Sequence, residues 1–82
     1  MRKLTEKQRA VLLTLEQAED EEFPALSPTQ IGQRNGKKYH EASSWASGAL
    51  KSLLERDAVK AVMAGQYRLT PWGRQAIKDG EA

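Results

Sequence analysis

The fold of this chain is decided by residues 26–70, LSPTQIGQRNGKKYHEASSWASGALKSLLERDAVKAVMAGQYRLT. Within this stretch, residues 26–32 carry the signals of a helix start, and residues 42–56 have the apolar spacing of a second helix. Residues 59–70 alternate apolar and polar side chains around an Ala-Gly-Gln turn, which is typical of a β-hairpin. The sequence therefore predicts an α+β fold in which two consecutive helices are followed by a short hairpin.

The first of these two helices has a well-marked start and end. Ser27 is a preferred capping residue, Pro28 suits the first helical position, and Gln30 completes a capping box with Ser27. The Asn-Gly pair at residues 35–36 favours a left-handed cap, so we expect this helix to be short. Residues 37–40, Lys-Lys-Tyr-His, are then predicted to form an exposed basic connection.

The helix predicted at residues 42–56 has two contrasting faces. Its apolar stripe consists of Ala42, Ala46, Ala49, Leu50, Leu53 and Leu54. Its opposite face, at 100° per residue, holds Glu41, Ser44, Gly48, Lys51, Ser52 and Glu55. Small polar groups line the amino-terminal half of that face, which would let the helix approach another surface closely. Gly48 costs ~1 kcal/mol of helix propensity relative to alanine, and either such an approach or close helix packing inside the domain would explain it.

A further helix is predicted before this stretch. Thr5 and Gln8 form a second capping box. The apolar residues at helical spacing around it are Leu4, Val11, Leu12, Leu15 and Ala18. The acidic run at residues 19–22 should fray the end of this helix, because negative charge is unfavourable at a helix carboxyl terminus. Phe23 follows the run and is expected to plug the core beneath the loop.

A last helix is predicted after the hairpin. Thr70 is a suitable cap and Pro71 a suitable first residue. Its apolar face, expected to pack against the first helix, consists of Trp72, Ala76 and Ile77. Residues 79–82 are expected to be frayed.

Composition and charge limit the class of protein. With 82 residues and no cysteine, the chain is expected to be a single domain spanning residues 1–82, without disulfides. No apolar run approaches the ~20 residues that span a bilayer, and no signal peptide is recognisable, so we expect a cytoplasmic protein with no membrane contact. Residues 1–22 carry four basic and six acidic groups, a net charge of −2, whereas residues 23–82 carry nine basic and five acidic groups, a net charge of +4. The positive part coincides with the stretch that decides the fold.

Three pieces of the chain carry a resemblance to a known family: residues 26–32 (LSPTQIG), 46–53 (ASGALKSL) and 67–73 (YRLTPWG). Their order and spacing resemble the winged helix-turn-helix DNA-binding domains of bacterial regulators, including the MarR and ArsR groups. In that family they would be the start of the second helix, the recognition helix, and the strand-to-helix exit of the wing. The resemblance implies a small winged helix with a three-helix core containing the helix-turn-helix, a two-stranded β-wing and a short C-terminal helix.

Two departures from the family pattern lie between the second and third helices. The family usually has a leucine where this chain has Asn35, and the connection at residues 37–40 looks about four residues longer than usual. We expect Tyr39 to fold inward and replace the missing leucine.

The resemblance implies binding to double-stranded DNA, sequence-specific or semi-specific, by a small transcriptional regulator of a bacterium, phage or plasmid. The helix at 42–56 would enter the major groove amino end first, with the wing at 59–70 on the DNA backbone. The candidate readers of base edges or phosphates are Ser43, Ser44, Ser47 and Lys51. The candidate phosphate contacts are Ser27, Thr29, Arg34, Lys37, Lys38, His40 and Arg68. Trp45 would either pack against a sugar or be partly buried in the domain.

The same residues also bear on other functions. Catalysis lacks a nucleophile–base pair and a glycine-rich phosphate loop, so we expect no enzyme and no cofactor. His40 has no second histidine or cysteine near it in sequence, so no metal site is expected. A protein-docking or dimerisation module of winged-helix fold, binding a second copy or a partner protein through Trp45 and Trp72, remains open. RNA or single-strand binding is less favoured, because few aromatic side chains are available for base stacking.

Overall fold

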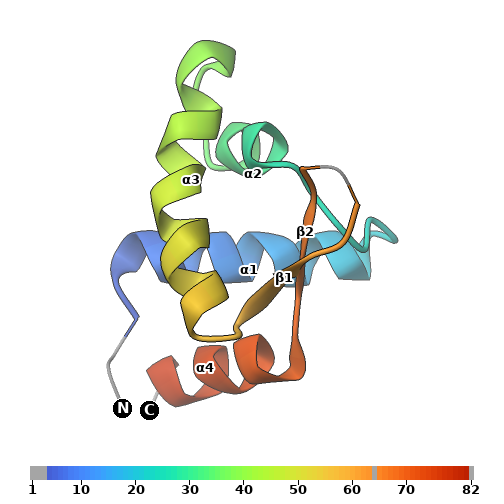
Figure 1. Cartoon of the computed structure of the whole chain (residues 1–82), viewed down its shortest axis with the longest axis vertical. Helices are drawn as coiled ribbons and strands as arrows, with labels where there is room; N and C mark the ends of the chain where they lie inside the picture. Colours follow the sequence, from blue (N-terminus) through green and yellow to red (C-terminus); the bar gives the residue numbers. More distant parts are fainter. Residues whose placement is uncertain (1–3, 64, 82) are drawn as a thin grey trace.

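The computed structural model describes residues 4–63 and 65–81, with side chains described up to residue 79. Its elements, in chain order, are α1 (Glu6–Asp20), α2 (Pro28–Arg34), α3 (Tyr39–Glu55), β1 (Val59–Ala61), β2 (Tyr67–Leu69) and α4 (Pro71–Glu81). In Figure 1, α3 crosses in front of α1, α2 packs against the upper half of α3, and α4 lies below α1. The prediction of a small α+β fold with a hairpin after two consecutive helices is confirmed.

The helices begin where the capping residues predict. The Thr5 hydroxyl accepts a hydrogen bond from the Gln8 backbone N–H at 3.1 Å, and the Gln8 side chain accepts one from the Thr5 backbone N–H at 3.1 Å. Ser27 and Gln30 make the same reciprocal pair at 3.2 and 2.9 Å. Thr70 accepts from the Gly73 N–H at 3.1 Å at the start of α4. Each side chain satisfies a backbone group that the first turn would leave unpaired.

The ends of α1 and α2 are closed by left-handed residues. Gly36, with φ of 81°, follows α2, and the next residue, Lys37, donates its N–H to the Gly32 carbonyl at 3.0 Å. Glu22 adopts φ of 71° after α1, and Phe23 donates to the Ala18 carbonyl at 2.8 Å. Both bonds are those of a Schellman motif. The predicted Asn-Gly cap is confirmed, whereas the end of α1 is not frayed as predicted, because the Glu22 cap closes it within the acidic run.

The core lies between α1, α2 and α3 and is closed on one side by the hairpin and α4. Its buried members are Val11, Leu12, Leu15, Ala18, Leu26, Ile31, Ala46, Ala49, Leu50, Leu53, Ala58, Val59, Leu69 and Ile77. The stripes predicted for the first and third helices supply most of this set. Among the residues described, no helix combines the length and apolar character that crossing a membrane requires.

The sheet is an antiparallel hairpin with one additional pairing. Val59 pairs with Leu69 and Ala61 with Tyr67. Leu26, just before α2, also pairs with Tyr67, through backbone hydrogen bonds of 3.0 and 2.8 Å. This bridge could not be predicted from the sequence, because a single paired residue leaves no alternating pattern. It fixes the start of α2 against the edge of the hairpin.

Two glycines set how closely the elements approach. A Cβ on Gly32 would lie 2.6 Å from the Cα of Ala42, so α2 and α3 touch backbone to backbone at this point. A Cβ on Gly73 would lie 2.8 Å from a methyl carbon of Leu69 and closer still to the Ala58 carbonyl oxygen. Both glycines belong to the stretches that carried the family resemblance.

The prediction for residues 37–40 was wrong in part. The third helix begins at Tyr39, three residues before the predicted start, and ends at Glu55. The N–H groups of Glu41 and Ala42 donate to the Lys38 carbonyl at 3.0 and 2.9 Å, which closes the first turn. That turn is polar, so it carries no apolar periodicity that would reveal it. Two of the four residues of the connection inferred from the sequence therefore belong to the helix.

Three aromatic side chains are more exposed than predicted. Tyr39 does not fold inward, since it is 75% exposed. Phe23 is 54% exposed and lies beneath the Arg34 guanidinium, with 5.6 Å between the guanidinium carbon and the ring centroid. Trp72 is 65% exposed. The inner face of α4 is formed by residues 73, 76 and 77, so Gly73 takes the inward position that was predicted for Trp72. The same helix continues to Glu81, through part of the tail that was expected to be frayed.

Candidate nucleic-acid interface

The outward face of α3 brings together four of the predicted contact residues. Ser43, Ser44, Ser47 and Lys51 are all exposed along this helix. Gly48 lies among them, and a Cβ built on it would meet no other described atom within 4 Å. Close packing inside the domain is therefore not the reason for this glycine, and that alternative was wrong. The middle of the outward face therefore carries only short side chains, which are polar apart from Gly48.

The hydroxyl of Ser47 has a fixed role in its helix. It donates to the Ser43 carbonyl oxygen at 2.6 Å. Because its proton is used in this way, the Ser47 oxygen offers only lone pairs to an outside group. On this face it would accept hydrogen bonds from a partner.

Trp45 lies at the edge of that face and is partly buried. It packs against the hydrophobic core, which confirms the partly buried alternative. Two ammonium groups lie over its ring: the Lys37 Nζ is 5.4 Å from the ring centroid and the Lys7 Nζ is 5.6 Å from it. Both distances are within the range of cation–π attraction. The position of Lys7 could not be predicted from the sequence, because nothing in the order of residues pairs α1 with the third helix.

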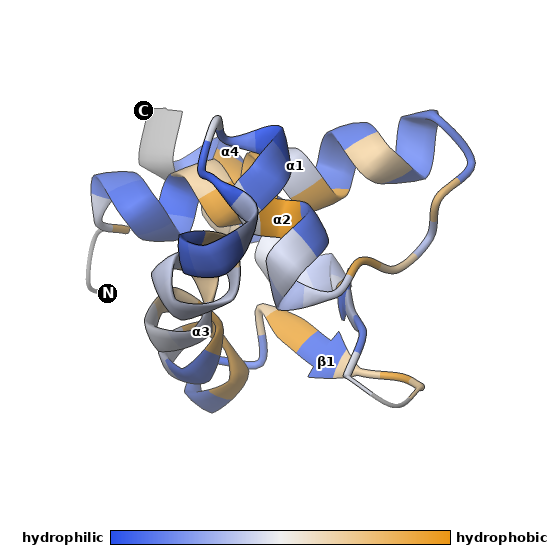
Figure 2. Cartoon of the chain, turned by 90° about the horizontal axis from the view of Figure 1, so that it is seen from above, coloured by the Kyte–Doolittle hydropathy of each residue, from blue (hydrophilic) through white to orange (hydrophobic). Residues whose placement is uncertain are grey.

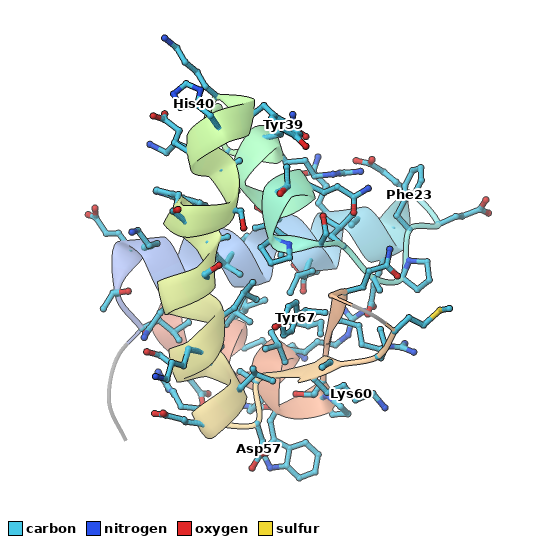
Figure 3. All side chains as sticks on the ribbon, turned by 45° about the horizontal axis from the view of Figure 1, so that its top comes forward. Phe23, Tyr39, His40, Asp57, Lys60 and Tyr67 are labelled. Atoms are coloured by element: carbon cyan, nitrogen blue, oxygen red, sulfur yellow. The ribbon has the colours of Figure 1, made fainter. Side chains whose placement is uncertain are left out.

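The basic residues before and at the start of α3 surround its amino end. Lys38 and His40 are exposed and Lys37 is partly buried. Figure 3 shows His40 at the tip of the helix, next to Tyr39. A shallow depression beside them is lined by Lys37, Glu41, Ser44 and Trp45. The Glu41 carboxylate is the negative member of this otherwise basic corner.

Arg34 and Arg68 are held elsewhere, by the acidic end of α1. The Arg34 Nη1 lies 3.1 Å from the Glu21 carboxylate, and the Arg68 Nη2 lies 4.0 Å from that of Glu19. Arg74 from α4 also pairs with Glu19 and lies 3.7 Å from Glu16. The acidic run thus joins α2, the hairpin and α4 to α1. The structure does not bring Arg34 or Arg68 to the α3 face, because their charges are paired with this run.

Ser27 and Thr29 lie at the start of α2, next to the Leu26–Tyr67 bridge, and both are partly buried. The Ser27 oxygen already accepts the N–H of Gln30 in its capping box. The structure therefore gives Ser27 a local role in starting the helix, separate from the surface of α3.

The hairpin has an apolar tip. Met63 is 73% exposed and Val62 is also exposed, and Figure 2 shows this end of the hairpin as hydrophobic. Gly65 supplies the left-handed residue of the turn, with φ of 74°, whereas the Ala64 of the predicted turn lies outside the described residues. Lys60 and Arg68 stand opposite each other on paired strands, away from the tip.

A separate surface surrounds Trp72 at the start of α4. One hollow beside it is lined by Lys60, Arg68 and Asp57, among others, and a second by Arg56, Gln75 and Asp79, among others. Pro71 and Trp72 belong to both hollows. This surface carries charges of both signs around an exposed indole.

Among the described residues, no group of three or more His, Asp or Glu side chains is placed to hold a metal ion. Comparison with protein-family models, with curated proteins and with solved structures found no match to this chain.

Proposed function

We propose that this chain is a small winged-helix protein that binds double-stranded DNA through α3, as a transcriptional regulator of a bacterium, phage or plasmid. The observation that carries the proposal is the outward face of α3, where Gly48 and three exposed serines form a low surface with Lys51. A surface helix that makes no outside contact usually carries long charged side chains on that side. Small side chains instead allow the helix backbone to approach a partner closely.

The arrangement of the elements supports the same function. Seen from above in Figure 2, α3 and the hairpin lie on one side of the molecule, with α1 and α4 on the other. The Leu26–Tyr67 bridge holds the start of α2 against the hairpin, so α2, α3 and the hairpin form one unit. A helix and an adjacent hairpin on one side are what a groove and its flanking backbone require.

The dimensions of α3 suit the major groove. At 1.5 Å per residue its 17 residues span about 25 Å, and the major groove, about 12 Å wide, admits one helix. Lys37 and Lys38 lie before its amino end, and Lys51 lies on its outward face. These lysines would neutralise phosphates on either side of the groove.

The chemistry of α3 supports modest sequence discrimination. Between Tyr39 and Glu55 the helix contains no arginine, so it lacks the bidentate contact to guanine that carries much specificity. Serine discriminates weakly between bases. A second copy or a partner protein would have to supply the remaining specificity.

The proposal is tested by titrating a fluorescent random-sequence duplex with the wild type and with Lys37→Gln/Lys38→Gln/Lys51→Gln. If three lysines each neutralise one phosphate, the slope of log K against log salt should be about −3 in the wild type. Each lysine removed should reduce the slope by about 0.9, so the triple variant should lose most of the salt dependence. Lys78→Gln, an exposed lysine in the last turn of α4, is the control. Absence of wild-type binding even at low salt would reject DNA binding.

A second function, protein docking or dimerisation, is favoured by Trp72. An indole that is 65% exposed between two surface hollows is the kind of anchor that protein interfaces use. Docking through this surface would depend much less on salt than DNA binding does. Trp45 is a weaker candidate anchor, because it is partly buried and two lysine ammonium groups lie over its ring.

A further inference from the structure

Trp45 gathers two lysines that come from distant parts of the chain. Lys7 lies in the first turn of α1, and Lys37 lies in the connection between α2 and α3. Their ammonium nitrogens are 5.6 and 5.4 Å from the centroid of the same indole ring. The two nitrogens therefore lie at most 11.0 Å apart, which is the sum of these distances. Two positive charges are concentrated at one edge of α3.

The indole has an anchored position, whereas the lysines reach solvent. Trp45 packs against the hydrophobic core, so its ring is held by the same residues that hold α3. Lys7 is exposed and Lys37 is partly buried. Cation–π attraction at exposed sites is weak, about 0.5–1 kcal/mol, so each ammonium group is oriented by the ring but stays free to contact an outside anion.

This pair of charges adjoins the outward face of α3. The depression beside Trp45 is shared with Ser44, which belongs to that face, and with Glu41 and Lys37. A duplex that holds α3 in its major groove has a phosphate backbone along each edge of the groove. One strand of B-DNA presents a phosphate every ~3.4 Å along the helix axis, so two nitrogens at most 11.0 Å apart are close enough together to contact neighbouring phosphates of one strand.

We propose that Lys7, Lys37 and Trp45 form a backbone clamp, in which the two lysines bind phosphates of one DNA strand and Trp45 positions them. The clamp rests on the proposed binding of DNA by α3 and adds Lys7, from α1, to the contact residues. Trp45 acts through the lysines and is a positioning residue. Glu41 lines the same depression, so its carboxylate repels the strand that the lysines attract.

The first test replaces each charge without shortening the side chain. Lys7→Gln and Lys37→Gln should each weaken duplex binding about tenfold at 50 mM salt and reduce the salt slope by about 0.9. Glu41→Gln should strengthen binding several-fold, a gain that damage to the fold would not produce. Lys78→Gln removes one positive charge that is not part of the clamp and so controls for the change in net charge. Thermal melting of each variant checks that it is folded.

The second test follows Trp45 itself. In a Trp72→Phe background, Trp45 is the remaining tryptophan, so its emission reports on the clamp. Addition of unlabelled duplex should change this emission with the same midpoint as the binding curve. Trp45→Phe keeps a smaller aromatic face and should lower affinity less than Trp45→Leu, which keeps apolar packing but removes the ring.

The outcomes separate the clamp from the proposed function. If the wild type binds duplex with a steep salt slope but Lys7→Gln and Lys37→Gln behave like Lys78→Gln, the clamp is wrong and DNA binding by α3 stands. Unchanged Trp45 emission with duplex bound would also reject the clamp alone. If the wild type binds no duplex at low salt, DNA binding and the clamp are both rejected.

Discussion

The Asn35 side chain donates a hydrogen bond from Nδ2 to the Thr14 hydroxyl oxygen at 2.8 Å, and so ties the end of α2 to the middle of α1. The same amide donates to the Ile31 carbonyl at 2.8 Å, and the Thr14 hydroxyl donates to the Ala10 carbonyl at 2.7 Å. Thr14 is only 7% exposed. A bonded polar pair thus occupies the position where the winged helix-turn-helix domains that the sequence resembles usually have a leucine.

This pair should behave as a unit when it is mutated. Thr14→Val removes the acceptor of a partly buried amide, so it should lower the free energy of unfolding by about 1–3 kcal/mol. Asn35→Leu in the Thr14→Val background should recover part of that loss, because replacing both partners with apolar groups can be nearly neutral. Urea denaturation of the two single variants and the double variant gives the coupling. Strictly additive effects would show that the bond contributes nothing specific.

The contact between α2 and α3 should make Gly32 intolerant of any side chain. Gly32→Ala would push a methyl group against the backbone of Ala42, and overpacking of this kind costs about 1–3 kcal/mol. Gly48→Ala is the matched control, because its methyl group would point into open space. It should stabilise the protein by about 0.5–1 kcal/mol. Equal thermal shifts in the two variants would contradict the backbone contact.

Substitutions at Gly48 should lower DNA affinity without lowering the stability of the protein. If α3 approaches DNA closely at this residue, Gly48→Met should lower duplex affinity while leaving the melting temperature equal to or above that of the wild type. Gly48→Ala should lie between the two. The comparison uses the same duplex titration at a fixed salt concentration. An affinity that stays constant across the series would place the bound DNA away from the middle of α3.

The exposed Trp72 allows a direct test of the docking alternative. Trp72→Ser should change the free energy of unfolding by no more than about 0.5 kcal/mol, because substitutions on an exposed surface usually stay within that range. Sedimentation equilibrium then measures self-association of both proteins. If the wild type forms dimers that Trp72→Ser does not, the surface around α4 is a dimer interface. A monomeric wild type would argue against dimerisation through Trp72.

The acidic end of α1 should contribute modest, salt-sensitive stability. Glu19 forms ion pairs with both Arg68 and Arg74, and its side chain is more buried than that of either arginine. Glu19→Gln should lower the free energy of unfolding by about 0.5–1 kcal/mol at low salt, as partly exposed ion pairs do. The difference should shrink in high salt. A loss independent of salt would point to packing instead.

Local signals in the sequence were sufficient to predict where most elements begin. The capping residues Thr5, Ser27 and Thr70 and the left-handed Gly36 act within one or two turns of the chain, so their neighbours in sequence determine them. The start of α3 at Tyr39 could not be predicted, because no such local signal marks it. Its first turn is closed by the Lys38 backbone alone, without a side-chain cap or an apolar residue to mark it.

Contacts between distant segments could not be predicted in this way. Arg34 and Arg68 looked like free positive charges, because no spacing rule pairs them with Glu21 and Glu19. Lys7 over Trp45 likewise depends on how α1 crosses α3. Helical periodicity was therefore sufficient to predict which side chains of α3 are exposed, whereas the contacts that Arg34 and Arg68 make with α1 could not be predicted.

The pairing of three arginines with the end of α1 leaves lysines to supply the positive charge on the predicted face of α3. An ammonium group is a compact charge that attracts a phosphate from many directions, whereas a guanidinium fork fixes the geometry of its partner. Contacts of the first kind survive a shift of one base pair along the duplex. For a DNA-bound chain, this favours sliding along the double helix over tight arrest at one register.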